Sequence, residues 1–462
     1  MRSNILFIMA DQFRADALGV AGGASRTPNL DRLASEGCLF RRAVTNAPEC
    51  VPARFSLATG LYPHASQVWR NAALTLDPGF PTWIRALAAA GYRTSLFGKT
   101  HFHPHGGDLR RREALMQRYG LQCVDEIAGP WASMSTLSHM TAGWESKGLW
   151  EPYRRDLAER RASKPYVVRP SPLGFDDYYD VYVGRQACLH LRSAKAPWFC
   201  WVSFAGPHEP WDTPEPYDLL YDPAAMTAAV PRPASVGRTK GLLRRAFDSP
   251  VHSPCLADQE VRRLRADYAA AVTLIDRQIG DIIAVLESSG AFDRTLIVFT
   301  SDHGEMNGDH GLLYKGQFLA AAVDIPLIVR PPLGQRARRG AQVDALVELM
   351  DVGATIAEYA GLPPPAGSSA RSLRALVEGR AQTHRCAVLS EFDGWRMVDD
   401  GRWKAEFAPD GEATMLFDRA ADPREEIDLA EDRAAQPVIA GLRSRLAAMQ
   451  TASARAPAAV TA

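Results

Sequence analysis

The segment Cys50-Val51-Pro52-Ala53-Arg54 places a thiol and a guanidinium at a fixed spacing. The simplest interpretation is a buried structural cysteine near the start of a helix, which is an inert role. A cysteine-dependent phosphatase would carry its arginine further along, in a loop of backbone amides. In this chain Arg54 follows Cys50 by only four residues and a proline intervenes. A thiol hydrolase would need only a histidine partner, and it would leave the oxygen-rich residues described next unexplained.

Two distant pairs of residues, Asp11-Gln12 and Asp302-His303, carry the donor atoms of a metal site. Three of them offer hard oxygen atoms and one an imidazole, a mixture that favours Ca²⁺, Mg²⁺ or Mn²⁺ over a thiolate-rich zinc site. Taken singly, the first pair could cap a strand and the second could form a turn with Gly304.

Each pair lies within two residues of the end of a short apolar run, and two further polar segments lie close to the ends of such runs. The runs cover residues 4–10, 94–97, 198–204 and 296–300. They are continuous rather than alternating, as in strands buried on both faces of a mostly parallel sheet. Gly98-Lys99-Thr100-His101 follows the second run and Pro207-His208-Glu209 the third. Because open α/β sheets bind ligands outside the carboxyl ends of their strands, the four sets together predict one site.

Helical patterns separate these runs. Thr27-Pro28 predicts the start of a helix that Gly37 ends. A second helix is predicted over residues 81–90, and apolar residues three or four apart predict a long one over 259–289. Strands that alternate with helices predict an α/β fold, with a large mostly parallel or mixed sheet sandwiched by helices.

After Cys386 the sequence pattern changes to short strand-like runs separated by turns. The runs AVLSEF, WRMV, RWKAEF and TMLFD, with turns at Asp400-Gly401 and Asp410-Gly411, predict a small antiparallel sheet, followed by a helix to about Met449. We predict a catalytic α/β domain over 1–385, a C-terminal α+β subdomain over 386–450 and a disordered tail over 451–462. Irregular insertions at about 103–196 and 212–254 should lie over the site and shape specificity.

The sequence resembles the sulfatase family of the alkaline phosphatase superfamily, and specifically its formylglycine-dependent members. The motif that carries the resemblance is Cys50-x-Pro52-x-Arg54 with the trailing Thr59-Gly60, and agreement extends over nearly the whole chain. The other matching segments are Asp11-Gln12, 27–34, 60–63, 98–101, 301–305 through Lys315, and 416–418 followed by Asp422-Pro423 and Glu425. The resemblance implies an alkaline-phosphatase-like fold and hydrolysis of sulfate monoesters to inorganic sulfate and an alcohol or phenol.

The resemblance also implies that a formylglycine-generating enzyme oxidises Cys50 to an aldehyde, which hydrates to a geminal diol. One hydroxyl attacks sulfur and displaces the alcohol, and deprotonation of the other then expels sulfate. Asp11, Gln12, Asp302 and His303, together with residue 50, would hold one divalent ion, Ca²⁺ or Mn²⁺, with Mg²⁺ as a further candidate.

Further roles are carried over from the family residue by residue. Arg54 would orient the diol, Lys99 would support its alkoxide, and His101 would act as the base that collapses the hemiacetal. His208 and Lys315 would bind the sulfate oxygens and neutralise charge on the departing oxygen. Asn71 and Thr100 are predicted to line the substrate pocket.

Three departures bear on the substrate. Ala53 stands where the commonest sulfatase motif has serine, Gln12 replaces a second aspartate, and His303 replaces an asparagine. This set resembles the phosphonate monoester hydrolase branch, whose members also accept phosphate diesters and sulfate monoesters. Residues 98–102 and 207–211 look more like sulfatases proper. We therefore predict a sulfatase, with a phosphonate monoester or phosphodiester hydrolase as the alternative.

Two other classes remain as alternatives. Two-zinc phosphatases of the same superfamily would need more His and Asp ligands and a Ser or Thr nucleophile. A non-catalytic ligand-binding relative is the expectation if Cys50 stays a thiol.

Several polar residues near the predicted site have simpler interpretations. His103 and His105 look like a chelating pair, but surface or substrate-rim positions are expected. Asp309 and His310 are expected to brace the loop that carries Asp302. Trp211 could wall the pocket or pack in the core.

Composition excludes several partners. The 462 residues contain 53 Lys+Arg and 53 Asp+Glu, so the zero net charge gives no reason to expect nucleic acid or a membrane surface. No apolar run approaches the roughly 18 residues of a membrane span, and residues 5–10 are too few for a secretory signal. Seven scattered cysteines do not suggest a disulfide framework. We expect a cytoplasmic protein that binds a small-molecule ester, and a homo-oligomer is left open.

Overall fold

A mixed eight-stranded sheet forms the centre of the computed structural model, which describes residues 2–164, 166–233, 239–453 and 460–461. The strands in spatial order are β11 (Ala341–Val343), β2 (Cys38–Phe40), β10 (Leu327–Arg330), β8 (Thr295–Ser301), β1 (Asn4–Ala10), β7 (Trp198–Ser203), β5 (Arg93–Gly98) and β6 (Cys123–Glu126). The five strands from β8 to β6 run parallel, whereas β10 is antiparallel to both β8 and β2. The predicted fold class is confirmed, and all four predicted strands exist.

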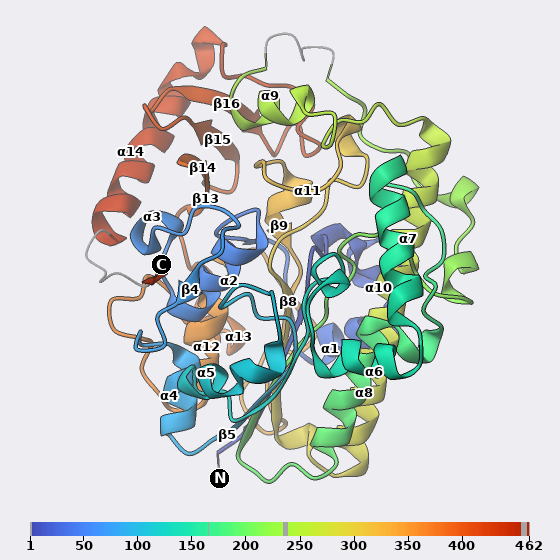
Figure 1. Cartoon of the computed structure of the whole chain (residues 1–462). Coiled ribbons are helices and arrows are strands. Elements are labelled where there is room, and N and C mark those ends of the chain that lie inside the picture. Colours follow the sequence, from blue (N-terminus) through green and yellow to red (C-terminus); the bar gives the residue numbers. More distant parts are fainter. Residues whose placement is uncertain (1, 165, 234–238, 454–459, 462) are drawn as a thin grey trace.

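Helices cover both faces of this sheet, and Figure 1 shows them to its left and right. One face carries α1 (Pro28–Glu36), α8 (Tyr179–Leu191) and α10 (Asp258–Ser288); the other carries α2 (Cys50–Thr59), α4 (Trp83–Ala89), α12 (Asp351–Tyr359) and α13 (Arg374–Val377). Along β1, Leu6 and Ile8 enter one core while Ile5 and Phe7 enter the other. Because both faces of β1 are buried, its sequence reads as a continuous apolar run.

The three helices predicted from the sequence are present. The first begins at Pro28 and Gly37 is its C-cap, as the Pro and Gly preferences predict. The second spans Trp83–Ala89, and the side chain of Thr82 caps it by accepting the N–H of Arg85. The long helix spans Asp258–Ser288.

The prediction that residues 103–196 are irregular is wrong. This stretch folds into β6 and the helices α5 (Glu113–Arg118), α6 (His139–Ser146), α7 (Trp150–Ser163) and α8. In α7 only Tyr153, Leu157 and Arg160 are buried. Such a narrow buried stripe among Arg and Glu residues gives almost no apolar periodicity, and this is why the sequence did not reveal the helix. The second stretch, 212–254, contains α9 (Gly241–Asp248).

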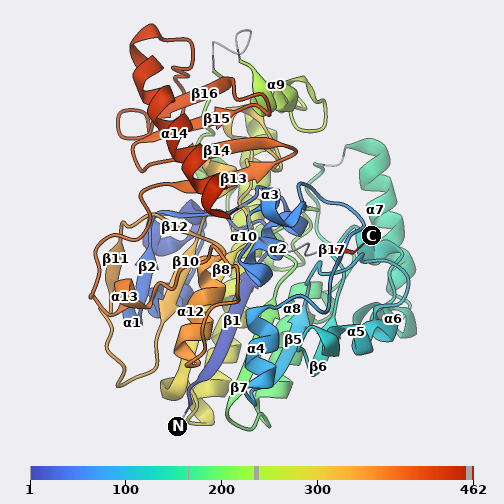
Figure 2. The same ribbon diagram turned by 90° about the vertical axis from the view of Figure 1, so that its left-hand side faces the viewer.

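A second, four-stranded antiparallel sheet follows in the chain, packed against α14 (Gln436–Ser453) (Figure 2). Its strands are β13 (Val388–Phe392), β14 (Trp395–Asp399), β15 (Trp403–Phe407) and β16 (Ala413–Asp418). Both predicted turns lie between the strands that they should join, with Gly401 and Gly411 at positive φ. This part of the fold was predicted correctly, whereas the exact domain limits stay a prediction.

The chain end differs from the predicted disordered tail. Residues 451–453 continue α14, and β17 (Val460–Thr461) pairs with β4 (Thr75–Leu76). Residues 454–459 and 462 lie outside the described residues. The backbone of Thr75 and Leu76 offers an open strand edge that the tail pairs with, a long-range contact that composition does not reveal.

A three-stranded sheet joins the two larger ones. It consists of β12 (Val347–Glu348), β3 (Ala43–Val44) and β9 (Asp324–Ile325), and the short helices α3 (Pro63–Ser66) and α11 (Ala320–Val323) lie nearby in the chain. Within the described part of the chain, no helix has the length and apolar character needed to cross a bilayer.

Candidate active site

Strand ends bring the predicted metal ligands together. Strands β1 and β8 are parallel neighbours with Ala10 opposite Ser301, so Asp11 and Asp302 leave the sheet side by side. Cys50, the first residue of α2, points to the same place. One ligand atom each from Asp11, Cys50, Asp302 and His303 lies within 4.8 Å of all the others, and all four residues are buried.

The Cys50 thiol lies among these donors. Its Sγ is 3.1 Å from Nε2 of His303, 3.6 Å from Oδ1 of Asp11 and 3.9 Å from Nζ of Lys99. Its position at the N-terminus of α2 favours a negatively charged or strongly polar group there. Two carboxylates, an imidazole and residue 50 converging on one point are a donor set that fits a divalent cation, so the residues present fit the predicted metal.

Arg54 and Lys99 balance the charge of the two aspartates. Arg54 Nε donates to Oδ2 of Asp302 at 2.7 Å, and its Nη2 donates to Oδ2 of Asp11 at 3.2 Å. Lys99 Nζ contacts the same oxygen of Asp11. Burial favours protonation of Asp11, but Lys99 and the neighbouring cations outweigh it and hold its pKa well below the usual value. The pKa of Asp302 is lowered as well, so both aspartates are ionised.

Gln12 lies beside this group in a strained conformation, with φ at 66°. Its backbone N–H donates to Oδ1 of Asp302 at 3.1 Å. Its side-chain oxygen accepts from Lys315, and its amide nitrogen donates to Glu305 and, at 2.8 Å, to Glu209. The structure thus places Gln12 and Lys315 together at the site, while metal ligation by Gln12 stays a prediction.

The sequence analysis gave no role to Glu209 and Glu305, which the structure places around Gln12. Glu305 is fully buried and also accepts the N–H groups of Asn307 and Tyr314. Burial and the charge of Glu209 raise the pKa of Glu305 to about 7. Both carboxylates belong to segments that the sequence analysis singled out, 207–209 and 301–305, and this is the signal that could have revealed their part in the site.

His101 is partly buried and has a positive φ of 58°. Desolvation of its ring, with the nearby charge of Lys99, lowers its pKa well below that of a free imidazole, so the ring is neutral. The ring of His105 packs against it at a tilt of 46°, with centroids 4.4 Å apart. A neutral imidazole beside Lys99 is able to accept a proton.

The prediction that His103 and His105 lie at the surface or on a substrate rim is wrong. Their Nε2 atoms lie 2.8 Å and 3.1 Å from the two carboxylate oxygens of Glu126 at the end of β6, and both rings are buried. Thr100 also donates to Glu126. Glu126 therefore fixes the segment that follows β5 through its contacts with Thr100, His103 and His105. This role depends on the pairing of β6 with β5, which the sequence alone does not reveal.

The remaining predicted residues lie around this centre. The loop that carries His208 is fixed by Asp180, which accepts the N–H groups of Ala205 and Gly206 at 2.8 Å and 3.0 Å. His208 Nδ1 lies 2.8 Å from the carbonyl oxygen of its neighbour Glu209. Asn71 accepts the N–H of Val51 at 2.8 Å and so fixes the first turn of α2. For Asn71 and Thr100, contact with substrate stays a prediction.

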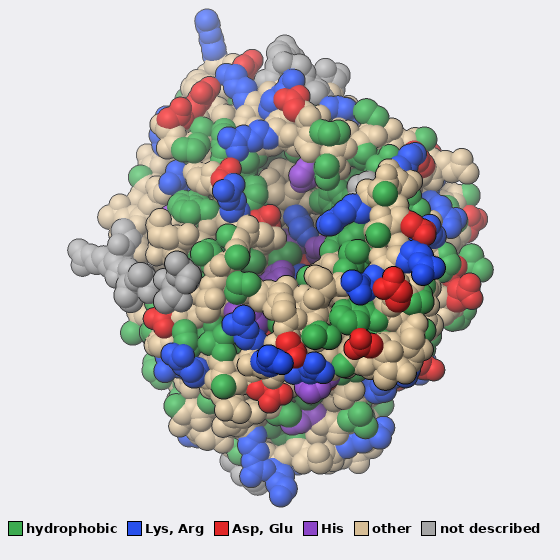
Figure 3. All heavy atoms as spheres, viewed as in Figure 1, with side chains coloured by type: hydrophobic (Ala, Val, Ile, Leu, Met, Phe, Trp, Pro, Cys, Tyr) green, Lys and Arg blue, Asp and Glu red, His purple; other side chains and the backbone are tan. Residues whose placement is uncertain are grey.

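A cleft of about 800 Å³ opens from this centre, and Glu49, Glu209 and Lys315 line its inner end. Figure 3 shows a hollow near the middle of this face with Lys or Arg and His side chains in its depth. Residues 131 and 161 from the first predicted insertion and 242–252 from the second line the cleft, where such insertions are expected to shape specificity.

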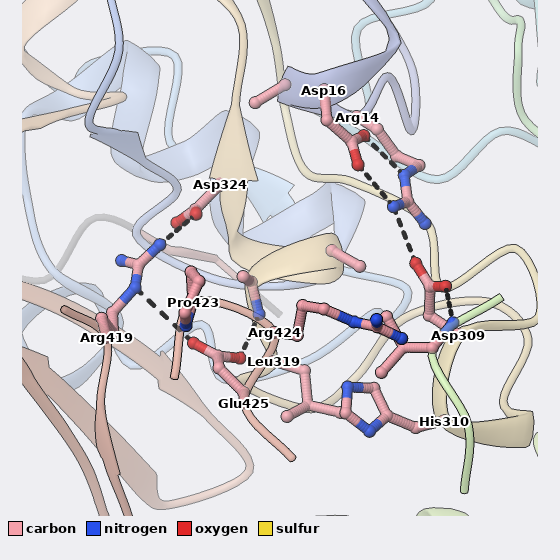
Figure 4. Close-up of a pocket in the computed structure, with 14 residues that line it drawn as sticks. Arg14, Asp16, Asp309, His310, Leu319, Asp324, Arg419, Pro423, Arg424 and Glu425 are labelled. Atoms are coloured by element: carbon pink, nitrogen blue, oxygen red, sulfur yellow. Dashed lines mark hydrogen bonds and ion pairs between the residues drawn. The ribbon is translucent and has the colours of Figure 1, made fainter. Parts of the chain in front are cut away.

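A separate cavity of about 260 Å³ contains none of the predicted site residues (Figure 4). On one side Asp309 accepts from Arg14 at 2.8 Å, and Arg14 also donates to the carbonyl oxygens of Glu305 and Met306. Asp309 thus braces the loop after Asp302, as expected. Trp211 is buried in the core beside Tyr314.

Comparisons with known proteins agree with this geometry. The family model described as "Sulfatase" matches residues 3–362, and one described as "N-sulphoglucosamine sulphohydrolase, C-terminal" matches 308–452. The chain is 31% identical to the multifunctional alkaline phosphatase superfamily protein PehA of Trinickia caryophylli, over 94% of this chain and 92% of the relative. It is 28% identical to an arylsulfatase of Clostridium perfringens, over 85% and 82%.

Among solved structures, the phosphonate monoester hydrolase of Agrobacterium radiobacter has the same fold. Its TM-score is 0.81 at 27% identity, and the match covers 97% of this chain and 96% of that one. The match of the family model to most of the chain, together with the buried donor set at the strand ends, establishes the family. The chain belongs to the sulfatase family of the alkaline phosphatase superfamily.

Proposed function

We propose that this protein hydrolyses sulfate monoesters, with a nucleophile derived from Cys50 and one divalent metal ion. The observation that carries the proposal is the convergence of Asp11, Cys50, Asp302 and His303 within 4.8 Å. Gln12 is proposed as a further ligand. A divalent cation held there would supply Lewis acidity at the ester and lower the pKa of the nucleophile. The oxygen-rich donor set supports Ca²⁺ or Mn²⁺, with Mg²⁺ as a further candidate.

Five further side chains position the nucleophile, transfer its proton and stabilise negative charge. Arg54, held by Asp11 and Asp302, fixes the nucleophile, and Lys99 stabilises its negative charge. His101, neutral because its ring is desolvated beside Lys99, accepts the proton when the covalent sulfate ester collapses. His208, together with Lys315 at the inner end of the cleft, binds sulfate oxygens and the departing oxygen. We further propose Asn71 and Thr100 as substrate-lining residues.

The nucleophile is proposed to be formylglycine, which as its hydrate supplies a hydroxyl for attack on sulfur. The Cys50-x-Pro52-x-Arg54 motif supports this modification, and a formylglycine-generating enzyme is the maturation partner. Mass spectrometry of the peptide that contains residue 50 tests it, because conversion lowers the mass by roughly 18 Da. An unmodified thiol in active protein would overturn this step.

The second candidate is a phosphonate monoester or phosphodiester hydrolase with secondary sulfatase activity. Gln12 and His303 in the donor set favour it, as do the similarities to PehA and to the phosphonate monoester hydrolase. Rates on 4-nitrophenyl sulfate and on 4-nitrophenyl phenylphosphonate, measured in parallel, decide between the two. We expect the larger kcat/KM on the sulfate, and a clear preference for the phosphonate would reverse the order.

We also propose a compartment for the protein and a size class for its substrate. All seven cysteines are free, which fits a reducing compartment and supports a cytoplasmic location. The ester substrate is proposed to be a small molecule, since the cleft of about 800 Å³ has the size of a small-molecule site. A homo-oligomer stays an open expectation.

A further inference from the structure

The cleft beside Lys315 is lined in part by apolar side chains. Six of its lining residues are aromatic or aliphatic, and they come from separate parts of the chain: Trp131, Leu242, Ala246, Val251, Tyr314 and Phe392. Val251 exposes about half of its surface, 51%, and so adds accessible apolar surface to the cleft. Such walls favour a flat, apolar leaving group.

Some of the polar side chains of the cleft are paired with one another or with neighbours. Ser249 Oγ lies 3.0 Å from Nδ1 of His252. Arg245 donates to Asp393 at 3.0 Å. The aromatic and aliphatic side chains offer no hydrogen-bond partner to the hydroxyl groups of a sugar, whereas they can pack against the faces of an aryl ring. The apolar part of the cleft therefore suits an aryl group better than a sugar.

Arg161, in the last turn of α7, is the exception. Its guanidinium lies over the ring of Trp131, 5.3 Å from the centroid, and both residues line the cleft. Among the described residues, no carboxylate lies within 4 Å of Arg161, although most arginines near it are paired. Arg160 contacts Asp156, and Arg169 contacts Asp156 and Glu159. A cation fixed on an aromatic ring is well placed to bind an anionic group.

We propose that the natural leaving group is an aryl alcohol that carries a second anionic substituent, a carboxylate, and that Arg161 binds this substituent over Trp131. The inference rests on the proposed function, since it names the alcohol part of that ester. The aryl ring contacts the apolar walls while the sulfate lies at Lys315 and His208. In this arrangement the two anionic ends of the substrate contact separate cations.

Paired substrates test this inference. The sulfate esters of 4-hydroxyphenylacetate and of its methyl ester differ only in the anionic group. Because the methyl ester cannot form the charge-assisted hydrogen bond to Arg161, we expect kcat/KM to be about tenfold or more higher for the carboxylate. The Arg161→Gln variant should lose this preference.

Arg154→Gln is the matched control. Arg154 lies on the same helix and stacks on Trp150 at 5.4 Å, but it does not line the cleft. This variant should keep the wild-type preference. Equal kcat/KM for both esters in the wild-type protein, or an unchanged preference in Arg161→Gln, would overturn the inference while leaving sulfate ester hydrolysis intact. Faster turnover of a sugar sulfate than of the aryl carboxylate would also overturn it.

A binding measurement separates this inference from the proposed function. Calorimetry with free 4-hydroxyphenylacetate needs no turnover. Binding to the wild-type protein that falls at least tenfold in Arg161→Gln supports the inference, even if neither ester is hydrolysed. Equal binding to the two proteins contradicts it.

Discussion

Single side chains decide whether the centre can hold a metal ion. Asp302 is fully buried and contacts Arg54, while its other oxygen accepts the N–H groups of Gln12 and His303. Burial and the charge of Asp11 favour its protonated form, yet Arg54 and the other cations lower its pKa overall. The aspartate therefore contributes a full negative charge to the donor set, which a neutral amide would not supply.

The first prediction concerns Asp302→Asn. We expect bound divalent metal, measured by elemental analysis of the purified protein, to fall at least about tenfold, because one of the anionic ligands is lost. Activity on 4-nitrophenyl sulfate should fall with it. Asp293→Asn, an exposed residue of the segment before β8, is the control and should retain its metal. Full metal content in Asp302→Asn would contradict the assignment.

The second prediction concerns Glu126, which acts through other residues. Burial favours its protonated form, but His103 and His105 outweigh it and hold the pKa of Glu126 below the usual value, so the carboxylate is charged. In Glu126→Gln the histidines lose this anchor, and His101, whose ring packs against that of His105, loses its fixed position. We expect kcat to fall about tenfold with KM little changed, as for other misplaced catalytic groups.

Steady-state kinetics on 4-nitrophenyl sulfate provide the measurement for Glu126→Gln. The exposed Glu113→Gln, thirteen residues earlier in the same segment, should leave both constants unchanged. A rise in KM at constant kcat would show that Glu126 supports substrate binding rather than the position of His101.

At the scale of elements, the packing of α8 against the loop after His208 creates a pH-dependent contact. Asp212 is fully buried, and its Oδ1 accepts the hydroxyl groups of Tyr178 and Tyr179, both at 3.1 Å. Burial raises the pKa of Asp212 to about 8. In the unfolded chain the carboxyl has its ordinary pKa of about 3.9, so the folded state binds the proton more tightly.

The third prediction follows from that difference. Stability is greatest when Asp212 is protonated, and it falls as pH rises from about 4 towards 8, because over this range folding must take up a proton that the unfolded chain has already released. Asp212→Asn removes this contribution. We expect the variant to gain at least about 1 kcal/mol relative to the wild-type protein between pH 5 and pH 9. Thermal unfolding at both pH values measures it; a gain independent of pH would show that Asp212 does not titrate.

Local elements also explain what the sequence could and could not predict. The four strands were predictable because a strand that is buried on both faces consists of a continuous run of apolar residues. The predicted metal ligands were found because the polar residues after such a run lie at the edge of the sheet where ligands bind. The Cys50 motif itself identified the family. Helix α7 and the tail strand β17 were not predictable, since a stripe of three buried residues and a two-residue strand leave no periodic signal. The Glu126 contacts depend on the pairing of β5 with β6, which no local pattern encodes.

On the scale of the whole molecule, a network of ion pairs joins the C-terminal sheet to the catalytic part. Arg419, just after β16, contacts Asp324 of β9, and its Nε lies 3.6 Å from Glu425 (Figure 4). It also contacts Asp399 of β14. Glu425 also accepts the N–H of Ala320 at 2.8 Å and contacts the buried Lys404. Asp324 and Glu425 line the smaller cavity, and the one guanidinium compensates charges from both parts of the molecule.

The fourth prediction tests this network with Arg419→Gln. Removing the guanidinium breaks the ion pair of the fully buried Asp399 and takes one of two neighbouring cations from Glu425, and breaking such a buried pair costs about 3–5 kcal/mol. Arg402→Gln is the matched control, because Arg402 pairs with Asp418 on the same sheet at 2.8 Å but its side chain is 63% exposed. An exposed pair contributes about 0–1 kcal/mol, so this control should unfold close to the wild-type temperature. Thermal unfolding followed by circular dichroism compares the three proteins at pH 7. Equal losses in the two variants would mean that the junction is held by the apolar contacts between β13–β16 and the catalytic part, with the buried charges adding nothing.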